Sequence, residues 1–238
     1  MMLRPPIAVF DLDGTLADTI HDLIGTLNVV LGHEGVPRLS VQDGRAMVSA
    51  GARALIERGL AAAGREVVPA RLDELHRLFL AHYSEHLCDA TSLFPGVVDA
   101  LDRLEAAGFR LAVCTNKHEA YSVEVLEGLG VAHRFAAICG RDSFPYFKPD
   151  PRHLLLTVEK AGGDPGRAVM VGDSITDIAT ARAAGIPAVA VSFGYSDIPV
   201  DRLQPDIVID HYGELFAAVQ MLTRAAPSVR APANVTAA

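Results

Sequence analysis

The chain has few cysteines, few lysines and no excess of positive charge over its 238 residues. Its three cysteines, Cys88, Cys114 and Cys139, lack the spacing of a metal site or a disulfide framework, which favours a reducing cytoplasm. The net charge of −8 disfavours nucleic acid and anionic membranes as partners. No apolar run reaches the roughly 18 residues of a membrane-spanning helix, and the stretch before the first predicted strand is too short for a signal peptide. We therefore expect a cytoplasmic protein.

Half of the residues are apolar, so a chain of this length can bury the core of one large domain or two modest ones. Helical patterns dominate residues 18–88, whereas strands and helices alternate elsewhere. In that segment we expect one helix that ends near residue 31 and further helices over residues 41–49, 52–63 and 70–87. The expected strands cover residues 7–10, 110–114, 136–139, 168–171, 188–191 and 207–209. This order predicts an α/β fold with a doubly wound, mostly parallel, Rossmann-like sheet. We expect a core domain of residues 1–17 and 89–224, a helical cap domain of residues 18–88, and a disordered tail of residues 225–238.

The most informative segment is Asp11-Leu12-Asp13-Gly14-Thr15-Leu16, which directly follows an apolar run at 7–10. Apolar residues before two carboxylates are typical of a buried parallel strand that ends in a polar site. Side chains at i and i+2 leave a strand on the same side, so Asp11 and Asp13 should emerge together. Two close carboxylates repel each other unless a metal, a base or a shared proton lies nearby. An ordinary Asp-Gly turn is the alternative for this motif alone.

Two further segments carry groups that suit an anionic ligand. Thr115 and Asn116 follow the strand candidate and can donate hydrogen bonds to an anionic oxygen, although a helix cap would also explain them. Lys148 is one of only three lysines in the chain and precedes Pro149, where the backbone is restricted. A solvated surface lysine is the alternative for Lys148.

The fourth segment again combines a strand with acidic residues. Asp173 follows the strand candidate at 168–171, and Asp177 lies in the first turn of the next helix. Ser174 and Asp177 also match a helix capping box, which leaves Asp173 unexplained. Because ligands bind at the carboxyl ends of the strands in open parallel sheets, we expect all four segments to line one crevice.

The charges in this crevice predict a metal. Four carboxylates and an anionic ligand would repel one another unless cations compensate, and a hard divalent ion, Mg²⁺, together with Lys148 would do so. No cysteine or histidine stands at a proposed ligand position, which disfavours zinc.

The order Asp-x-Asp, Thr-Asn, Lys and Gly-Asp-x-x-x-Asp resembles the haloacid dehalogenase superfamily of phosphotransferases, over residues 7 to about 222. The resemblance implies Mg²⁺-dependent hydrolysis of a small phosphate monoester through an aspartyl-phosphate. It makes Asp11 the nucleophile and Asp13 the general acid and base, and it assigns the phosphoryl oxygens to Lys148, Thr115 and Asn116. The implied metal ligands are the Asp11 carboxylate, the Asp13 backbone carbonyl and Asp173, with Asp177 orienting metal-bound water.

Within the superfamily, the chain is most similar to phosphoglycolate phosphatases, which act on 2-phosphoglycolate. Residues 48–56, a small-residue turn before a cap helix, and residues 139–149 carry this likeness, although Arg141 stands where that family often has glycine. The inserted cap is expected to exclude water and select the substrate. Arg53 and Arg45 are the candidates for binding the substrate carboxylate, because arginine suits bidentate recognition; a solvated helix face is their alternative. His118 is interpreted as a surface residue.

Other members of the superfamily remain as alternatives or are excluded by residues. N-acetylmuramic acid 6-phosphate phosphatases share the cap turn, and a β-phosphoglucomutase-like isomerase shares the core motifs but not the cap loop. A non-catalytic phospho-switch is disfavoured by Asp13 and the cap. Asp13 also argues against a dehalogenase, and a cap without lysine excludes Schiff-base chemistry. The sequence is compatible with a monomer or a homodimer.

Overall fold

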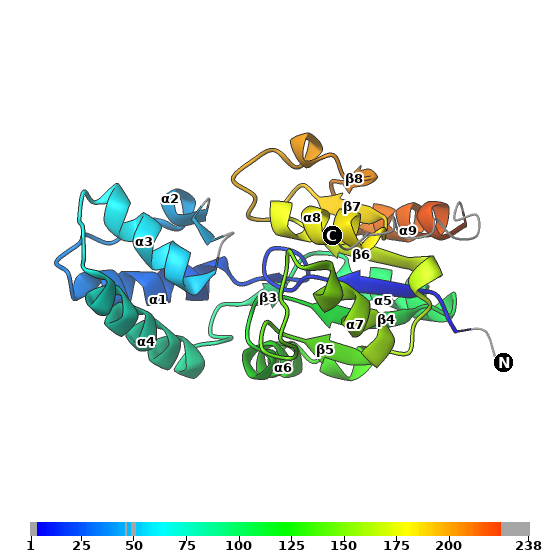
Figure 1. Ribbon diagram of the computed structural model, residues 1–238, viewed down its shortest axis with the longest axis horizontal. Coiled ribbons are helices and arrows are strands. Elements are labelled where there is room, and N and C mark those ends of the chain that lie inside the picture. Colours follow the sequence, from blue (N-terminus) through cyan, green and yellow to red (C-terminus); the bar gives the residue numbers. More distant parts are fainter. Residues whose placement is uncertain (1–3, 46, 49–50, 225–238) are drawn as a thin grey trace, which may run out of the picture.

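The computed structural model describes residues 4–45, 47–48 and 51–224, so the predicted disordered tail lies outside the described residues. The structure consists of a parallel sheet flanked by helices and a separate group of helices at one end (Figure 1). None of the helices in the described ranges is long and apolar enough to cross a lipid bilayer.

The sheet has six strands in the order β5-β4-β1-β6-β7-β8, and all neighbouring pairs are parallel. The strands are β1 (Ile7–Phe10), β4 (Arg110–Cys114), β5 (Ala137–Cys139), β6 (Ala168–Gly172), β7 (Ala188–Val191) and β8 (Ile207–Ile209). The predicted doubly wound α/β fold is thus confirmed, with strand boundaries that differ from the expected ones by no more than one residue.

Helices cover both faces of the sheet, which explains why its central strand is apolar throughout. Ala8 and Phe10 of β1 belong to the core on one face, together with α5 (Val97–Ala106), α6 (Glu119–Gly128) and α9 (Leu215–Arg224). Ile7 and Val9 belong to the core on the other face, with α7 (Pro151–Lys160) and α8 (Ile175–Ala184). Short 3₁₀ helices occur at Ala132–Arg134, Pro165–Arg167, Val200–Leu203 and Tyr212–Glu214.

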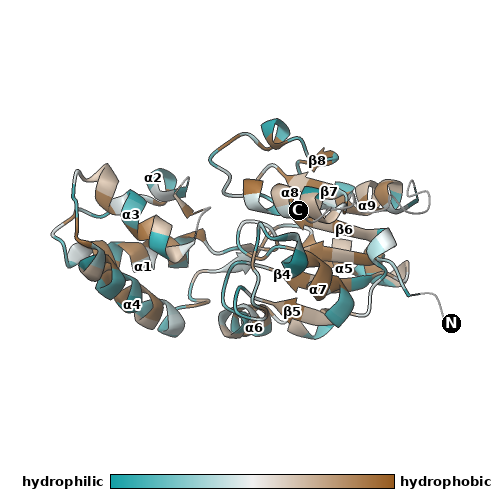
Figure 2. Ribbon diagram, viewed as in Figure 1, coloured by the Kyte–Doolittle hydropathy of each residue, from teal (hydrophilic) through white to brown (hydrophobic). Residues whose placement is uncertain are grey.

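Within the described residues, the separate group consists of the α-helices α1 (Ile20–Gly32), α2 (Val41–Arg45), α3 (Ala52–Ala62) and α4 (Pro69–Glu85). They lie within the segment that we propose as a cap domain. Hydrophobic and hydrophilic residues both occur along α4 (Figure 2), and its buried side chains, which include Leu75 and Phe79, pack against α1 and α3. The second helix ends at Arg45, earlier than the predicted residue 49, of which the structure gives no description.

A two-stranded antiparallel sheet, which the sequence did not predict, joins the helical group to the core. β2 (Ala17–Asp18) leads out of the core and β3 (Ser92–Leu93) leads back. Strands of two residues are too short for an alternating pattern to reveal them. The buried Asp22 carboxylate supports this junction, since it accepts hydrogen bonds from the backbone N–H groups of Ala90 and Thr91 and from the Thr91 hydroxyl.

Candidate active site

The four predicted segments meet at the carboxyl edge of the sheet, where β1, β4 and β6 end and the chain passes on to the helical group (Figure 1). One carboxylate oxygen each from Asp11, Asp173 and Asp177 lies within 4.8 Å of the others. All three side chains are buried, because they follow or lie beside strands covered on both faces. The predicted crevice therefore exists, and three of its four acids form one cluster.

Lys148 contacts two of the three acids of this cluster. Its Nζ atom is 3.0 Å from Oδ1 of Asp11 and 2.5 Å from Oδ1 of Asp177, and its side chain is almost fully buried. Burial by itself lowers the pKa of the Lys148 ammonium, but the two carboxylates outweigh it and raise that pKa above its ordinary value. The lysine is therefore charged and is not the solvated surface residue of the alternative interpretation.

The loop that carries Lys148 is fixed at both ends. The Asn116 side chain donates a hydrogen bond of 3.0 Å to the Lys148 carbonyl. Two residues further on, the Asp150 carboxylate accepts from the backbone N–H of Arg152 and caps α7, whose first residue is Pro151. The Asn116 side chain and the start of α7 thus hold the Lys148 loop, and with it the ammonium, in place.

Asp177 combines two roles. With Ser174 it forms the predicted capping box of α8, in which its Oδ2 atom accepts from the Ser174 backbone N–H at 3.1 Å. Its Oδ1 atom contacts Lys148. The helix cap therefore fixes an acid that also faces the cluster.

Hydrogen bonds and closely packed backbone fix the carboxylate of Asp173. Its Oδ2 atom accepts a hydrogen bond of 2.6 Å from the Tyr195 N–H, and its Oδ1 atom accepts one of 3.2 Å from the Thr15 hydroxyl. Gly14, at a φ of +78°, and Gly194 approach so closely that a Cβ atom on either would lie within 2.5 Å of Oδ2 of Asp173. Only glycine fits these two positions with Asp173 in this place.

The cluster holds more negative charge than Lys148 compensates. Burial, followed by the charge of Asp177, raises the pKa of Asp11 to about 6. Burial, followed by the charges of Asp177 and Asp11, raises the pKa of Asp173 to about 8. Close, buried carboxylate oxygens of this kind fit a hard divalent cation, so the residues present suit the predicted Mg²⁺.

Asp13 lies apart from the cluster and pairs with a residue that the sequence interpretation missed. The Lys117 Nζ atom is 3.0 Å from Oδ1 of Asp13 and 2.5 Å from the hydroxyl of Tyr83, which belongs to α4. The Lys117 side chain is buried. Burial lowers the pKa of its ammonium, but Asp13 and Tyr83 outweigh that effect and raise the pKa above its ordinary value. Its position directly after Thr115 and Asn116 was the one sequence signal that could have identified it.

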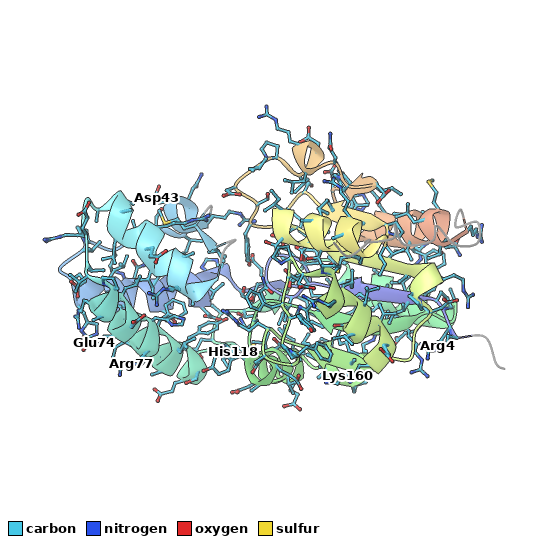
Figure 3. All side chains as sticks on the ribbon, in the orientation of Figure 1. Arg4, Asp43, Glu74, Arg77, His118 and Lys160 are labelled. Carbon is cyan, nitrogen blue, oxygen red and sulfur yellow. The ribbon has the colours of Figure 1, made fainter. Side chains whose placement is uncertain are left out.

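A cavity of ≈ 120 Å³ lies between the helical group and the sheet edge. Its floor includes Asp11, Asp13, Thr115 and Asn116, and α4 contributes His76, Phe79, Leu80 and Tyr83 to its walls. Arg141 also lines it, and so does His118, whose side chain is partly exposed as its interpretation as a surface residue predicts. Figure 3 shows His118 where the core meets the helical group.

The two predicted specificity arginines are engaged elsewhere among the described residues. Arg45 donates to the carbonyls of Phe193 and Gly194 at 2.6 and 3.1 Å, and its guanidinium lies 5.1 Å from the centre of the Tyr195 ring. Arg53 is half exposed and forms ion pairs with Asp73 and Glu57. Neither is among the described residues that line the cavity.

Comparisons with known proteins agree with these motifs. The family model of the haloacid dehalogenase-like hydrolases matches residues 8–191. A phosphoglycolate phosphatase from Mesorhizobium japonicum is 49% identical over 222 residues, which cover 93% of this chain and 98% of that protein. Another from Agrobacterium fabrum is 45% identical over 221 residues, or 92% of this chain and 95% of that protein.

A solved structure gives the same result. The crystal structure of a predicted phosphoglycolate phosphatase from Haemophilus somnus matches with a TM-score of 0.83 and 31% sequence identity, and covers 92% of this chain and 100% of that one. The resemblance that the motifs indicate is thus confirmed, and the chain belongs to the haloacid dehalogenase-like hydrolases.

Proposed function

We propose that this protein is a Mg²⁺-dependent phosphatase that hydrolyses 2-phosphoglycolate to glycolate and phosphate. The observation that carries the choice of substrate is the size of the cavity, ≈ 120 Å³, next to Asp11 and Asp13. Sites for drug-sized ligands measure roughly 300–1,000 Å³, so this one suits a molecule of a few heavy atoms. N-acetylmuramic acid 6-phosphate, the alternative, is far larger. The phosphoglycolate phosphatases that match nearly the whole chain support the same substrate.

In the proposed reaction, the Asp11 carboxylate attacks phosphorus and forms an aspartyl-phosphate, while Asp13 donates a proton to the departing glycolate oxygen. Asp13 then takes a proton from the water that hydrolyses the aspartyl-phosphate. Covalent catalysis of this kind replaces one difficult displacement by two easier ones. General acid–base catalysis contributes about 10²–10⁴-fold to such steps.

The remaining polar groups bind and orient. Lys148 lies 3.0 Å from the Asp11 carboxylate. Its ammonium can therefore stabilise the negative charge that develops on the phosphoryl oxygens. Thr115 lines the cavity and has a hydroxyl to donate, and Asn116 also holds the Lys148 loop. We assign the metal to the Asp11 carboxylate, the Asp13 carbonyl and Asp173, with Asp177 beside them; the ion would supply positive charge to the carboxylates and the phosphate.

The proposed location is a reducing cytoplasm, which the free thiols of Cys88, Cys114 and Cys139 support. Phosphate release tests the function directly. It should be measured with and without Mg²⁺ on 2-phosphoglycolate, N-acetylmuramic acid 6-phosphate, β-glucose 1-phosphate and p-nitrophenyl phosphate. We expect kcat/KM for 2-phosphoglycolate to exceed the others by about 10-fold or more and to require the metal. A preference for the amino sugar phosphate, or turnover that is unchanged by a chelator, would contradict the proposal.

A further inference from the structure

The cavity contains one strong cation whose charge no carboxylate neutralises within the described part of the chain. Lys148 pairs with Asp11 and Asp177, and Lys117 pairs with Asp13. Arg141 has no ion pair with any described residue, and its guanidinium lies 5.1 Å from the centre of the Phe147 ring. An aromatic neighbour of this kind orients a guanidinium but leaves its N–H groups free to bind an anion.

The backbone fixes Arg141 next to the reacting groups. Its N–H donates a 2.9 Å hydrogen bond to the carbonyl of Lys117, whose side chain contacts Asp13. The preceding Gly140 packs so closely against the start of α6 that a Cβ atom there would lie 2.2 Å from the N atom of Glu119. The loop is therefore closely packed against the core, and it places Arg141 on the core side of the cavity.

Two histidines line the same cavity from different parts of the molecule. His118 precedes α6 in the core and lies 3.3 Å from Asp142, whereas His76 belongs to α4 of the helical group. Burial lowers the pKa of His76, and the nearby charges of Arg53, Arg141 and His118 lower it further. Burial and these neighbouring charges disfavour a positive charge on His76, and an anion bound in the cavity would oppose that effect.

We propose that Arg141 binds the carboxylate of the substrate, with His118 beside it and His76 opposite; this assignment rests on the proposed function. The phosphate belongs at Asp11 and Lys148 and the leaving oxygen at Asp13, so the carboxylate extends away from the cluster toward the cavity wall. Arginine matches a carboxylate with two parallel hydrogen bonds, and among the described residues that line the cavity Arg141 is the cation without a carboxylate partner. Because His76 comes from the cap and Arg141 from the core, the bound carboxylate also favours the closed cap.

Two substrates that differ only in the carboxylate test this assignment. 2-Phosphoglycolate and 2-hydroxyethyl phosphate have the same two carbons, but the second ends in a neutral alcohol. For Arg141→Gln we expect kcat/KM on 2-phosphoglycolate to fall about 10–100-fold, mainly through KM, and kcat/KM on 2-hydroxyethyl phosphate to change less than about threefold. Arg141→Lys, which keeps the charge but not the fork, should lie between. Arg53→Gln, which changes an arginine outside the cavity, should leave the ratio of the two substrates unchanged.

The outcomes separate the two proposals. Equal turnover of both substrates by the wild-type protein would overturn the proposed function. A wild-type preference for 2-phosphoglycolate that Arg141→Gln leaves intact, or a loss that is equal for both substrates, would overturn only the role of Arg141. Selective loss in Arg53→Gln instead would return the carboxylate to the residue that the sequence suggested. Because Arg141 is exposed, its replacement should not disturb folding.

Discussion

The ammonium of Lys148 lies 3.0 Å from the carboxylate of Asp11 in an almost fully buried setting. The pair does not neutralise the site, because Asp177 and Asp173 add their charges and the pKa of Asp11 rises to about 6. An ionised Asp11 at neutral pH therefore reduces the stability of the metal-free fold. Ionised Asp11, the proposed nucleophile, thus lowers the free energy of unfolding of the metal-free protein. A neutral side chain of the same shape would remove this destabilisation.

Asp11→Asn should abolish turnover without harming the fold. We expect kcat to fall by more than about 10³-fold, since the amide cannot form the aspartyl-phosphate. The melting temperature of the metal-free variant at pH 7 should equal or exceed that of the wild type, because the folded pKa of Asp11 is raised and the amide removes the ionised form. Glu124→Gln, on the exposed face of α6 and outside its first turn, is the control and should leave both quantities unchanged. Hydrolysis at the wild-type rate by Asp11→Asn would disprove the nucleophile assignment.

Asp13→Asn should separate acid–base catalysis from metal binding. Turnover should fall about 10²–10⁴-fold, because the amide can neither donate nor accept the proton in question. The affinity for Mg²⁺ should stay within about threefold of the wild type, since the proposed metal contact of Asp13 is its backbone carbonyl. Isothermal titration calorimetry of the metal-free protein measures this affinity, and a loss of tenfold or more would show that the side chain itself holds the metal.

Segments in which sequence neighbours act together were predicted well. The apolar run of β1 followed by Asp11 required a buried strand and a polar strand end, and both are present. The capping box of Ser174 and Asp177 is likewise a local pattern. Because parallel strands bring their carboxyl ends to one edge, these local predictions were enough to assemble the acidic cluster.

Contacts between distant segments could not be predicted in this way. Lys117 and Asp13 are 104 residues apart in the sequence, and Arg45 and Phe193 are 148 apart. No periodicity links such positions. Lys117 meets Asp13 because β1 and β4 pair in parallel, and Arg45 meets Phe193 because the helical group packs over the strand ends. The same packing determines that Arg141 lines the cavity while Arg53 pairs with Asp73.

Gly194→Ala should weaken metal binding from outside the cluster. The new Cβ atom would lie 2.2 Å from Cβ of Asp173, so the carboxylate must move. Displacing a metal ligand through its neighbours typically reduces metal affinity about 10–100-fold, and we expect that loss together with a fall in turnover. Gly25→Ala is the control, because nothing lies within 4 Å of its new Cβ atom in α1. It should keep full activity and gain about 1 kcal/mol of stability. Undiminished Mg²⁺ affinity in Gly194→Ala would argue against Asp173 as a ligand.

His153 should make the protein less stable at mildly acidic pH. Its buried Nε2 donates to the Gly140 carbonyl at 3.1 Å, and burial, then Lys148, lowers its pKa from 6.5 to about 4. Below pH 6.5 the His153 side chain binds a proton in the unfolded chain but not in the folded protein. The contribution of His153 to the free energy of unfolding therefore falls until the pH reaches about 4. Between pH 7 and pH 5 the contribution is about 2 kcal/mol. From pH 7 to pH 5, the free energy of unfolding in urea should change less favourably in the wild type than in His153→Gln, by about 2 kcal/mol, because Asp11 and Asp173 contribute equally to both proteins. An equal change in both proteins would exclude this role of His153.

Arg45→Met should lower activity on all substrates alike. Arg45 reaches from α2 of the helical group to the carbonyls of Phe193 and Gly194, and the next residue, Tyr195, donates its N–H to Asp173. Losing these charge-assisted hydrogen bonds weakens the contact between the helical group and the core by about 1.5–3 kcal/mol, and under the proposed function every substrate needs this contact. We expect kcat/KM to fall about 10–100-fold on both 2-phosphoglycolate and 2-hydroxyethyl phosphate, with their ratio unchanged. Arg53→Met, which breaks ion pairs within the cap only, is the control and should leave both values near the wild type. A loss confined to 2-phosphoglycolate would mean that Arg45 leaves these carbonyls and binds the carboxylate itself, as its residue type first suggested.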